Sequence, residues 1–225
     1  MCLRLVGSEM CIRDSLLGRL KIYKLRSDIE IKEINDLYSY SLFNIDYEGD
    51  YNVYLNDPRN INLGKKLITN KKILIEKERL KEINETEYHE ILINHTTPYS
   101  PFDILENKSL LLENNFDNLN AIDWNKGCYV GQEITARMKY RGLLKKKLYA
   151  LKIKNGDVLK GDELIVDNKK IGTIVSKANS NIFAALNINF VNEIKNKNQN
   201  LVINDSLSFD FLNWKFFSIK TYWNY

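Results

Sequence analysis

The clearest pattern in this sequence is a series of short apolar segments in its C-terminal third, beginning near Leu144. Turn-forming residues separate the segments, an arrangement that is typical of consecutive β-strands. Asp167-Asn168 falls between two of them and predicts a tight hairpin turn. Short strands at such close spacing predict a small antiparallel β-barrel. The expected strands are 147–153, 163–166, 170–176, 182–188, 201–203, 207–212 and 214–220.

The residues before this series combine helix and strand patterns. A basic, periodic run at 16–26 indicates the end of a helix. Asn84 followed by Glu87 predicts a capped helix start, with His89 on the helix surface. His95 falls where that helix ends, and the helix dipole favours a cation there. The strand candidates in this part are 28–34, 37–45, 51–55 and 65–76.

The first fifteen residues, MCLRLVGSEMCIRDS, differ in character from the rest. Charged residues break any apolar core that a signal peptide would need. The stretch resembles the translation of a sequencing-library adapter, so we expect a non-native or unstructured tail that replaces the start of a longer natural protein. The expected domains are this tail (1–15), a first domain at 16–142 and the β-barrel at 143–225.

The composition of the 225 residues is that of an ordinary globular protein, with 44% hydrophobic and 28% charged residues. No apolar run is long enough to span a bilayer, so we expect no membrane contact. A net charge of +4 is mild and argues against direct nucleic-acid binding unless a local basic patch exists. Three cysteines, two of them near the N-terminus, do not form a disulfide framework, and a reducing compartment such as the cytoplasm fits best.

The candidate chemistry centres on Cys128, which lies between Gly127 and Gly131. The residues at 134–140 read as a helix, so the thiol would sit on a glycine-hinged loop at a helix start. The positive end of the helix dipole favours a thiolate there, and Lys126 adds to this effect. The alternative is that a lone cysteine is simply a small buried apolar residue. With two histidines and no C-x-x-C, the chain alone offers no complete zinc or iron–sulfur site.

This stretch also carries a resemblance to a known family. The sequence matches the signature K-G-C-Y-x-G-Q-E at all eight positions, Lys126, Gly127, Cys128, Tyr129, Val130, Gly131, Gln132 and Glu133. It resembles the YgfZ family of folate-binding proteins, which are related to the glycine-cleavage T-protein, an aminomethyltransferase, and include mitochondrial assembly factors for iron–sulfur proteins. Flanking segments are similar too: Asp57-Pro58-Arg59 with Leu63-Gly64 resembles the family's D-P-R…L-G element.

The resemblance implies an α+β protein, in which a truncated aminomethyltransferase (GcvT)-like folate-binding domain is followed by a small antiparallel β-barrel. It implies tetrahydrofolate as cofactor, with Glu113 as the contact of the pterin ring. Glu113 follows an apolar run at 109–112 that reads as a buried strand. For Arg59 the resemblance suggests a structural corner near the ligand cleft, whereas the residue type alone would suggest a solvated loop.

Two further arginines are candidates for anion binding. The stretch 134–156 contains no Asp or Glu, and Glu133, Arg137 and Arg141 are four residues apart, on one helix face. Either the two arginines form a solvated face on which Glu133 pairs with Arg137, or they form a wall for a folate polyglutamate tail, a phosphate or tRNA.

By resemblance, the chain is a folate-binding accessory protein for iron–sulfur cluster assembly or repair, serving enzymes that include tRNA-methylthiolating ones. Cys128 would be its reactive thiol. One thiolate cannot hold a cluster, so a transient cluster would be shared with a client or carrier protein. The location would be cytoplasmic, or the mitochondrial matrix in a eukaryote.

One alternative is a tetrahydrofolate-dependent aminomethyltransferase, although the signature is not a T-protein feature and the acid expected for that reaction is not visible. Another is an RNA-binding module built on the basic run at 137–154 and the aromatic C-terminus.

Overall fold

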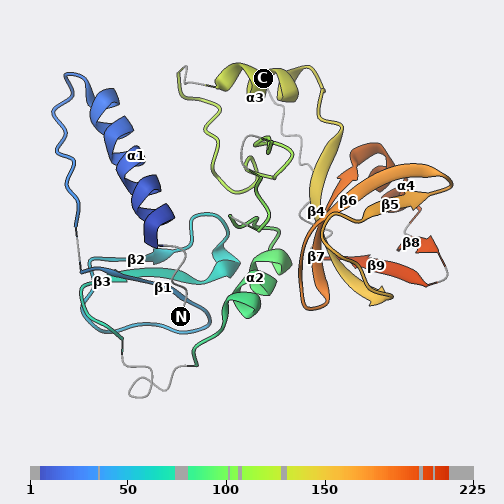
Figure 1. Cartoon of the computed structure of the whole chain (residues 1–225), viewed down its shortest axis with the longest axis horizontal. Helices are drawn as coiled ribbons and strands as arrows, with labels where there is room; N and C mark the ends of the chain where they lie inside the picture. Colours follow the sequence, from blue (N-terminus) through green and yellow to red (C-terminus); the bar gives the residue numbers. More distant parts are fainter. Residues whose placement is uncertain are drawn as a thin grey trace. The chain divides into compact units, whose positions relative to one another are not determined.

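The computed structural model describes residues 6–34, 36–73, 81–100, 102–105, 108–127, 131–197, 200–204 and 206–212, without the side chains of 6–13 and 204 (Figure 1). The chain forms two compact units, one ending at Tyr38 and the other beginning at Ser39. The first contains helix α1 (Val6–Lys24), which confirms a helix ending within 16–26 and crosses the expected boundary after residue 15. The foreign origin of 1–15 and the domain boundaries stay predictions. In the described part, no helix is long and apolar enough to cross a membrane.

A three-stranded sheet in the order β1-β3-β2 follows. Its strands are β1 (Tyr38–Leu42), β2 (Val53–Asn56) and β3 (Lys65–Thr69). Leu42 and Leu67 pack with Ile73 to form its apolar side. Three of the predicted strands are confirmed, but β3 is shorter than expected. It ends at Thr69, whose buried hydroxyl donates to the carbonyl of Asp50 (2.9 Å). The strand expected at 28–34 is absent from the described structure, where that segment has no regular secondary structure.

A buried carboxylate holds the turn between β2 and β3. The Asp57 side chain is 1% exposed and accepts hydrogen bonds from the Arg59 backbone N–H (3.0 Å), Nε (3.0 Å) and a terminal guanidinium nitrogen (2.7 Å). Burial alone would raise the pKa of Asp57, but these hydrogen bonds and the charge of Arg59 hold it below its usual value. Arg59 is therefore part of a structural corner and not a freely solvated loop residue.

Helix α2 (Glu85–Asn94) confirms the predicted capping box, since Asn84 and Glu87 each accept a hydrogen bond from the other's backbone N–H. The prediction that His89 is a surface residue is wrong. It is 4% exposed, its Nε2 lies 3.0 Å from Asp103 Oδ1, and its ring stacks on Phe102. Phe102 and Asp103 cover the helix face that the sequence pattern left to solvent, so the polar side chain is paired instead of hydrated.

His95 follows the last residue of α2 and is its C-terminal cap. We expected the helix dipole to favour a cation at this end. Burial instead lowers the pKa of His95, so the neutral imidazole is favoured. Desolvation thus acts against the cation that the dipole would favour at this position.

The C-terminal part is a six-stranded antiparallel sheet in the order β5-β6-β7-β4-β9-β8. Its edge strands β5 and β8 come into contact, so the sheet is a nearly closed barrel, as predicted. Asp167 and Asn168 both have positive φ values, 49° and 59°, as a tight hairpin turn requires. The strand expected at 214–220 lies outside the described residues. The six strands are β4 (Lys146–Asn155), β5 (Glu163–Val166), β6 (Lys169–Ala178), β7 (Asn181–Asn187), β8 (Leu201–Asn204) and β9 (Leu207–Phe211).

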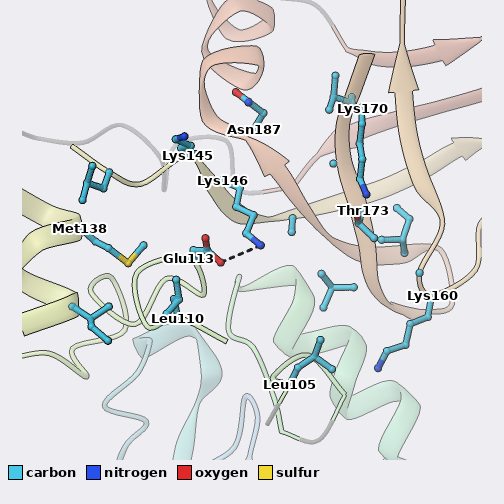
Figure 2. A pocket seen from close by; sticks show the side chains of 18 residues that line it. Leu105, Leu110, Glu113, Met138, Lys145, Lys146, Lys160, Lys170, Thr173 and Asn187 are labelled. Carbon is cyan, nitrogen blue, oxygen red and sulfur yellow. Dashed lines mark ion pairs between the residues drawn. The ribbon is translucent and has the colours of Figure 1, made fainter. Parts of the chain in front are cut away.

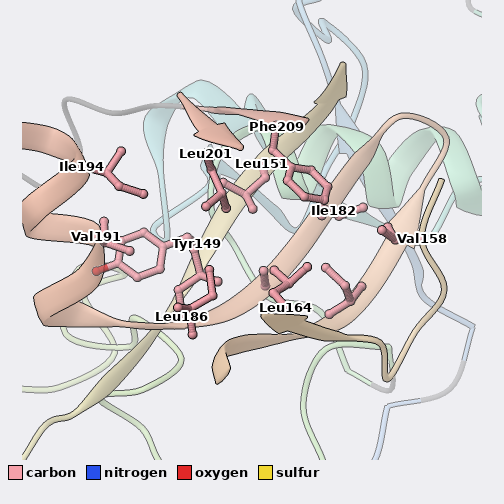
Figure 3. Close-up of a cluster of buried hydrophobic side chains, with 13 residues drawn as sticks. Tyr149, Leu151, Val158, Leu164, Ile182, Leu186, Val191, Ile194, Leu201 and Phe209 are labelled. Carbon is pink, nitrogen blue, oxygen red and sulfur yellow. The ribbon is translucent and has the colours of Figure 1, made fainter. Parts of the chain in front are cut away.

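Apolar side chains fill the barrel interior, and a helix that the sequence pattern did not predict covers one end (Figure 3). This helix, α4 (Ile188–Asn196), inserts Val191 and Ile194 into the same cluster as Tyr149 and Leu201. The apolar run at 182–188 looked like one strand. It breaks because the Asn187 side chain accepts from two backbone N–H groups of the first helical turn, as an N-cap does.

The outer face of the barrel is apolar where α2 lies against it. Ile93 of α2 packs with Leu148, Ala150 and Phe183. Asp103, the partner of His89, also accepts a hydrogen bond from the hydroxyl of Ser176 on β6. The barrel and the α2 region therefore share a core and a buried polar contact.

Gly64 follows the 3-10 turn η1 (Ile61–Leu63) at φ +71°, and a Cβ there would lie 2.0 Å from the carbonyl oxygen of Leu42. We expect Gly64→Ala to lower the free energy of unfolding by at least about 3 kcal/mol, from left-handed strain and a backbone clash. Gly142 has φ +61° but open space around it. Gly142→Ala should therefore cost only about 1 kcal/mol. Urea unfolding measures the free energy of unfolding of both variants. Equal decreases for Gly64→Ala and Gly142→Ala would contradict the predicted backbone clash at Gly64.

Candidate functional site

A cavity of about 910 Å³ lies between the barrel, helix α3 (Gln132–Tyr140) and the residues Leu105, Leu110 and Glu113 (Figure 2). A volume of this size is enough for a drug-sized or cofactor-sized molecule. The walls are mostly apolar, and they include Leu110, Ile134, Met138 and Ile174. Among the described residues that line the cavity, Glu113 is the one that carries a carboxylate.

Glu113 reaches the cavity through a turn segment and not through the strand that we expected at 109–112. Residues 111–120 form consecutive turns, in which Asn115 and Asn120 take the left-handed conformation. The Glu113 carbonyl accepts from the N–H of Leu148 (2.7 Å), and the Asn115 amide donates to the Leu148 carbonyl (2.7 Å). The expectation of a buried strand is therefore wrong, because asparagine-rich turns attach this segment to the edge of β4.

One lysine pairs with the carboxylate of Glu113, whose side chain is 17% exposed. Lys146 lies 3.3 Å from it, and Figure 2 shows this ion pair at the cavity wall. Lys145, Lys160 and Lys170 line the same cavity, Lys170 pairing with Glu163, which is not part of the lining. The lining therefore carries more positive than negative charge, which favours an anionic ligand.

The two arginines predicted to bind an anion do not line this cavity. Both are exposed, and Arg137 forms an ion pair with Glu133, one turn away on α3. This geometry is the solvated, paired face that the sequence analysis gave as an alternative. The folate-binding role of Arg137 and Arg141 stays a prediction. The sequence analysis did not place the cavity lysines together with Glu113. Lys160 and Lys170 come from a turn and a strand that lie far along the chain from Glu113.

The signature motif leads directly into α3. Cys128, Tyr129 and Val130 lie outside the described residues. Lys126 and Gly127 before them are exposed, and Gly131 after them is the N-cap of α3 in the left-handed conformation (φ +84°). The predicted helix start is thus confirmed, with Gln132 and Glu133 in its first turn.

The first N–H groups of α3 donate no hydrogen bond to an N-cap side chain, since Gly131 has none. The positive end of the helix dipole lies at the residues that follow the signature, and it favours an anion there. A cation–π contact fastens the segment before the signature, because Lys139 Nζ lies 3.6 Å from the ring of Trp124. Both flanks of the signature are thus held against α3.

Within the described ranges, no group of three or more His, Cys, Asp and Glu side chains is placed to hold a metal ion.

Comparison with known proteins points to one class. No protein-family model matches the chain. Its homologues are iron–sulfur cluster assembly factors. The iron-sulfur cluster assembly factor IBA57 homolog, mitochondrial, of Dictyostelium discoideum is 31% identical over 186 residues, which are 74% of this chain and 46% of that protein. The mitochondrial IBA57 factors of Mus musculus and Homo sapiens are each 24% identical over 66% of this chain and 45% of their own length. The chain thus spans slightly less than half of these relatives.

The hydrogen bond from Asn115 to Leu148 gives a test of how Glu113 is held. We expect Asn115→Gly to lower the free energy of unfolding by about 1–3 kcal/mol, because the buried Leu148 carbonyl loses its donor. Glycine accepts the left-handed backbone, so the lost contact alone is measured. The matched control is Asn120→Gly, another left-handed asparagine, whose bond to the Pro58 carbonyl is exposed. It should change stability by less than about 0.5 kcal/mol in the same urea titration.

Proposed function

We propose that this chain takes part in iron–sulfur cluster assembly or repair, that it binds tetrahydrofolate in the Glu113 cavity, and that Cys128 is its working thiol. The observation that carries the proposal is the 31% identity over 186 residues to an iron–sulfur cluster assembly factor. Because the relatives carry mitochondrial names, we place the chain in the mitochondrial matrix. The fold proposed for residues before the barrel is that of the aminomethyltransferase (GcvT)-like folate-binding domain.

The lining of the cavity suits a reduced folate. A pterin ring is flat and carries N–H donors, so it matches apolar walls with one carboxylate acceptor, Glu113. The glutamate end of a folate carries carboxylates, which match Lys145, Lys160 and Lys170. In this arrangement Glu113 orients the ring, while Lys146 holds the carboxylate in place from the side. Bound tetrahydrofolate supplies one-carbon carrier chemistry.

The thiol of Cys128 would act at the start of α3. Thiolates are the form of cysteine that bonds iron or attacks a sulfur species, and a helix N-terminus lowers the pKa of a nearby thiol. A [2Fe–2S] cluster takes about four protein ligands, so this chain supplies one ligand and the client or carrier protein supplies the others. The cluster is then cargo that passes between proteins. Clients would include iron–sulfur enzymes that methylthiolate tRNA.

Glu113→Gln tests the folate part of this proposal. The amide keeps the shape but loses the charged acceptor, so the Kd for tetrahydrofolate should rise about tenfold or more. Asp117→Asn is the matched control, since Asp117 pairs with Lys147 (3.5 Å) and does not line the cavity. Anaerobic isothermal titration calorimetry gives both values. Equal Kd values for wild type and Glu113→Gln would remove Glu113 from the ligand contacts, and a wild-type protein without affinity would end the folate proposal.

Complementation of cells that lack the endogenous homologue tests the thiol. Cys128→Ala and Cys128→Ser should both abolish methylthiolation of tRNA, measured by mass spectrometry of nucleosides, while the protein remains folded and abundant. The control is Cys11→Ala, which removes a cysteine of α1 and should restore activity fully. Full restoration by both Cys128 variants would show that this cysteine is a packing residue.

A further inference from the structure

A second pocket, of about 610 Å³, lies between β1, the Asp57–Arg59 turn and the start of α2. Its residues are described and are separate from the Glu113 cavity. Two cations line it, Arg59 and Lys66, with side chains only 30% and 28% exposed. Aromatic rings form much of the remaining wall, from Phe43, Tyr88 and Tyr99.

Hydrogen-bond donors converge on the hydroxyl of Tyr88. Lys66 Nζ lies 3.4 Å from it and 2.6 Å from the Ser41 hydroxyl. A phenol oxygen is a neutral and therefore weak acceptor for such cations. Arg59 has five N–H donors on its side chain, of which Asp57 takes two. The charged N–H donors of the pocket thus outnumber the charged acceptors that the protein places beside them.

Positively charged groups act on the hydroxyl of Tyr88. Burial alone would raise the pKa of the Tyr88 phenol, but hydrogen bonds with Ser41 and Arg59 and the charge of Lys66 lower it below its ordinary value. Asp57 does not cancel both cations, because it carries one negative charge and lies beneath them, 2.7 Å from Arg59 and 3.6 Å from Lys66. Glu85 also lines the pocket, but it is exposed, so water screens its charge.

We propose that this pocket is a second ligand site, which binds a phosphate group attached to an aromatic ring. Arg59 and Lys66 bind the phosphate oxygens, and the Tyr88 hydroxyl donates to one of them. A phosphate fits better than a carboxylate, since its three terminal oxygens and higher charge match donors that come from three directions.

The rings give the site its preference for an aromatic group. Tyr88 and Tyr99 meet edge to face, with ring centroids 5.6 Å apart, and Phe43 lies 6.1 Å from Tyr88. A flat group held by the phosphate can pack on this cluster, where aromatic pairs add to the burial of apolar area. This site is independent of the folate proposal, because it shares none of its lining residues with the Glu113 cavity.

Isothermal titration calorimetry of the full chain with phenyl phosphate, inorganic phosphate and benzoate tests the proposal. Phenyl phosphate should bind most tightly. Lys66→Gln should raise its Kd about tenfold or more, because a charged hydrogen bond is lost. The matched control is Lys65→Gln, the neighbouring residue on β3, whose ammonium pairs with Asp46 and does not line the pocket. This variant should stay within about twofold of wild type, as expected for an exposed ion pair.

Tyr88→Phe provides a second variant that keeps the ring and removes only the hydroxyl, and it should also weaken phenyl phosphate, by about threefold to tenfold. Circular dichroism checks that each variant is folded. The proposal is overturned if phenyl phosphate does not bind, or if Lys66→Gln and Tyr88→Phe bind it as wild type does. Benzoate binding as tightly as phenyl phosphate would overturn the phosphate assignment, and inorganic phosphate binding as tightly would overturn the role of the rings.

Discussion

The backbone of Leu148 is the point on which the geometry of the candidate site depends. In the barrel this residue lies opposite Ala185 of β7, yet its N–H and carbonyl both bond to the turn segment, at Glu113 and Asn115. On an antiparallel strand, the two groups of one residue point to the same side. At this position, therefore, β4 uses the side that faces away from β7 to hold the turn segment. Two residues later, the Ala150 carbonyl accepts from Leu212, just after β9. One strand edge is thus shared between the barrel and the segment that carries Glu113.

Buried acids organise the loops in the same part of the chain. Asp103 accepts from the Tyr99 backbone (2.6 Å) and the Ser176 hydroxyl and pairs with His89, which ties the 99–105 segment to both α2 and the barrel. Asp57 holds the turn before β3 in a similar way, because it accepts hydrogen bonds from the backbone and the side chain of Arg59. Burying an unpaired carboxylate would cost several kcal/mol, whereas each hydrogen bond to a charged group returns about 1.5–3 kcal/mol. A loop that buries a carboxylate is therefore stable only in a conformation that brings all of these donors to the carboxylate. This requirement fixes the conformation of the loop.

The sequence predicted those parts of the fold that depend on local pattern. Short apolar segments separated by turn residues identified the barrel strands, the Asp167-Asn168 pair identified the hairpin, and Asn84 with Glu87 identified the start of α2. The errors have two sources, a local helix cap and tertiary contacts. Residues 182–188 read as one strand because the apolar run continues, and only the cap at Asn187 starts α4 there. His89 read as a surface residue because the pattern of α2 does not reveal the segment that covers it. The lysines at 160 and 170 could not be grouped with Glu113 before the barrel topology was known.

Helix α3 connects the two parts of the candidate site. The signature ends in its first turn, and Ile134 and Met138 of the same helix line the Glu113 cavity. Ile134 is three residues after Gly131, so it lies only about 4.5 Å farther along the helix axis. Near the other end of this short helix, Lys139 contacts the ring of Trp124, which precedes the signature. A shift of α3 would therefore move the residues on both sides of the signature. Any molecule that fills the cavity must contact the first turns of this helix. The positions of the residues that flank Cys128 and the occupation of the cavity are therefore not independent, because the same helix borders both.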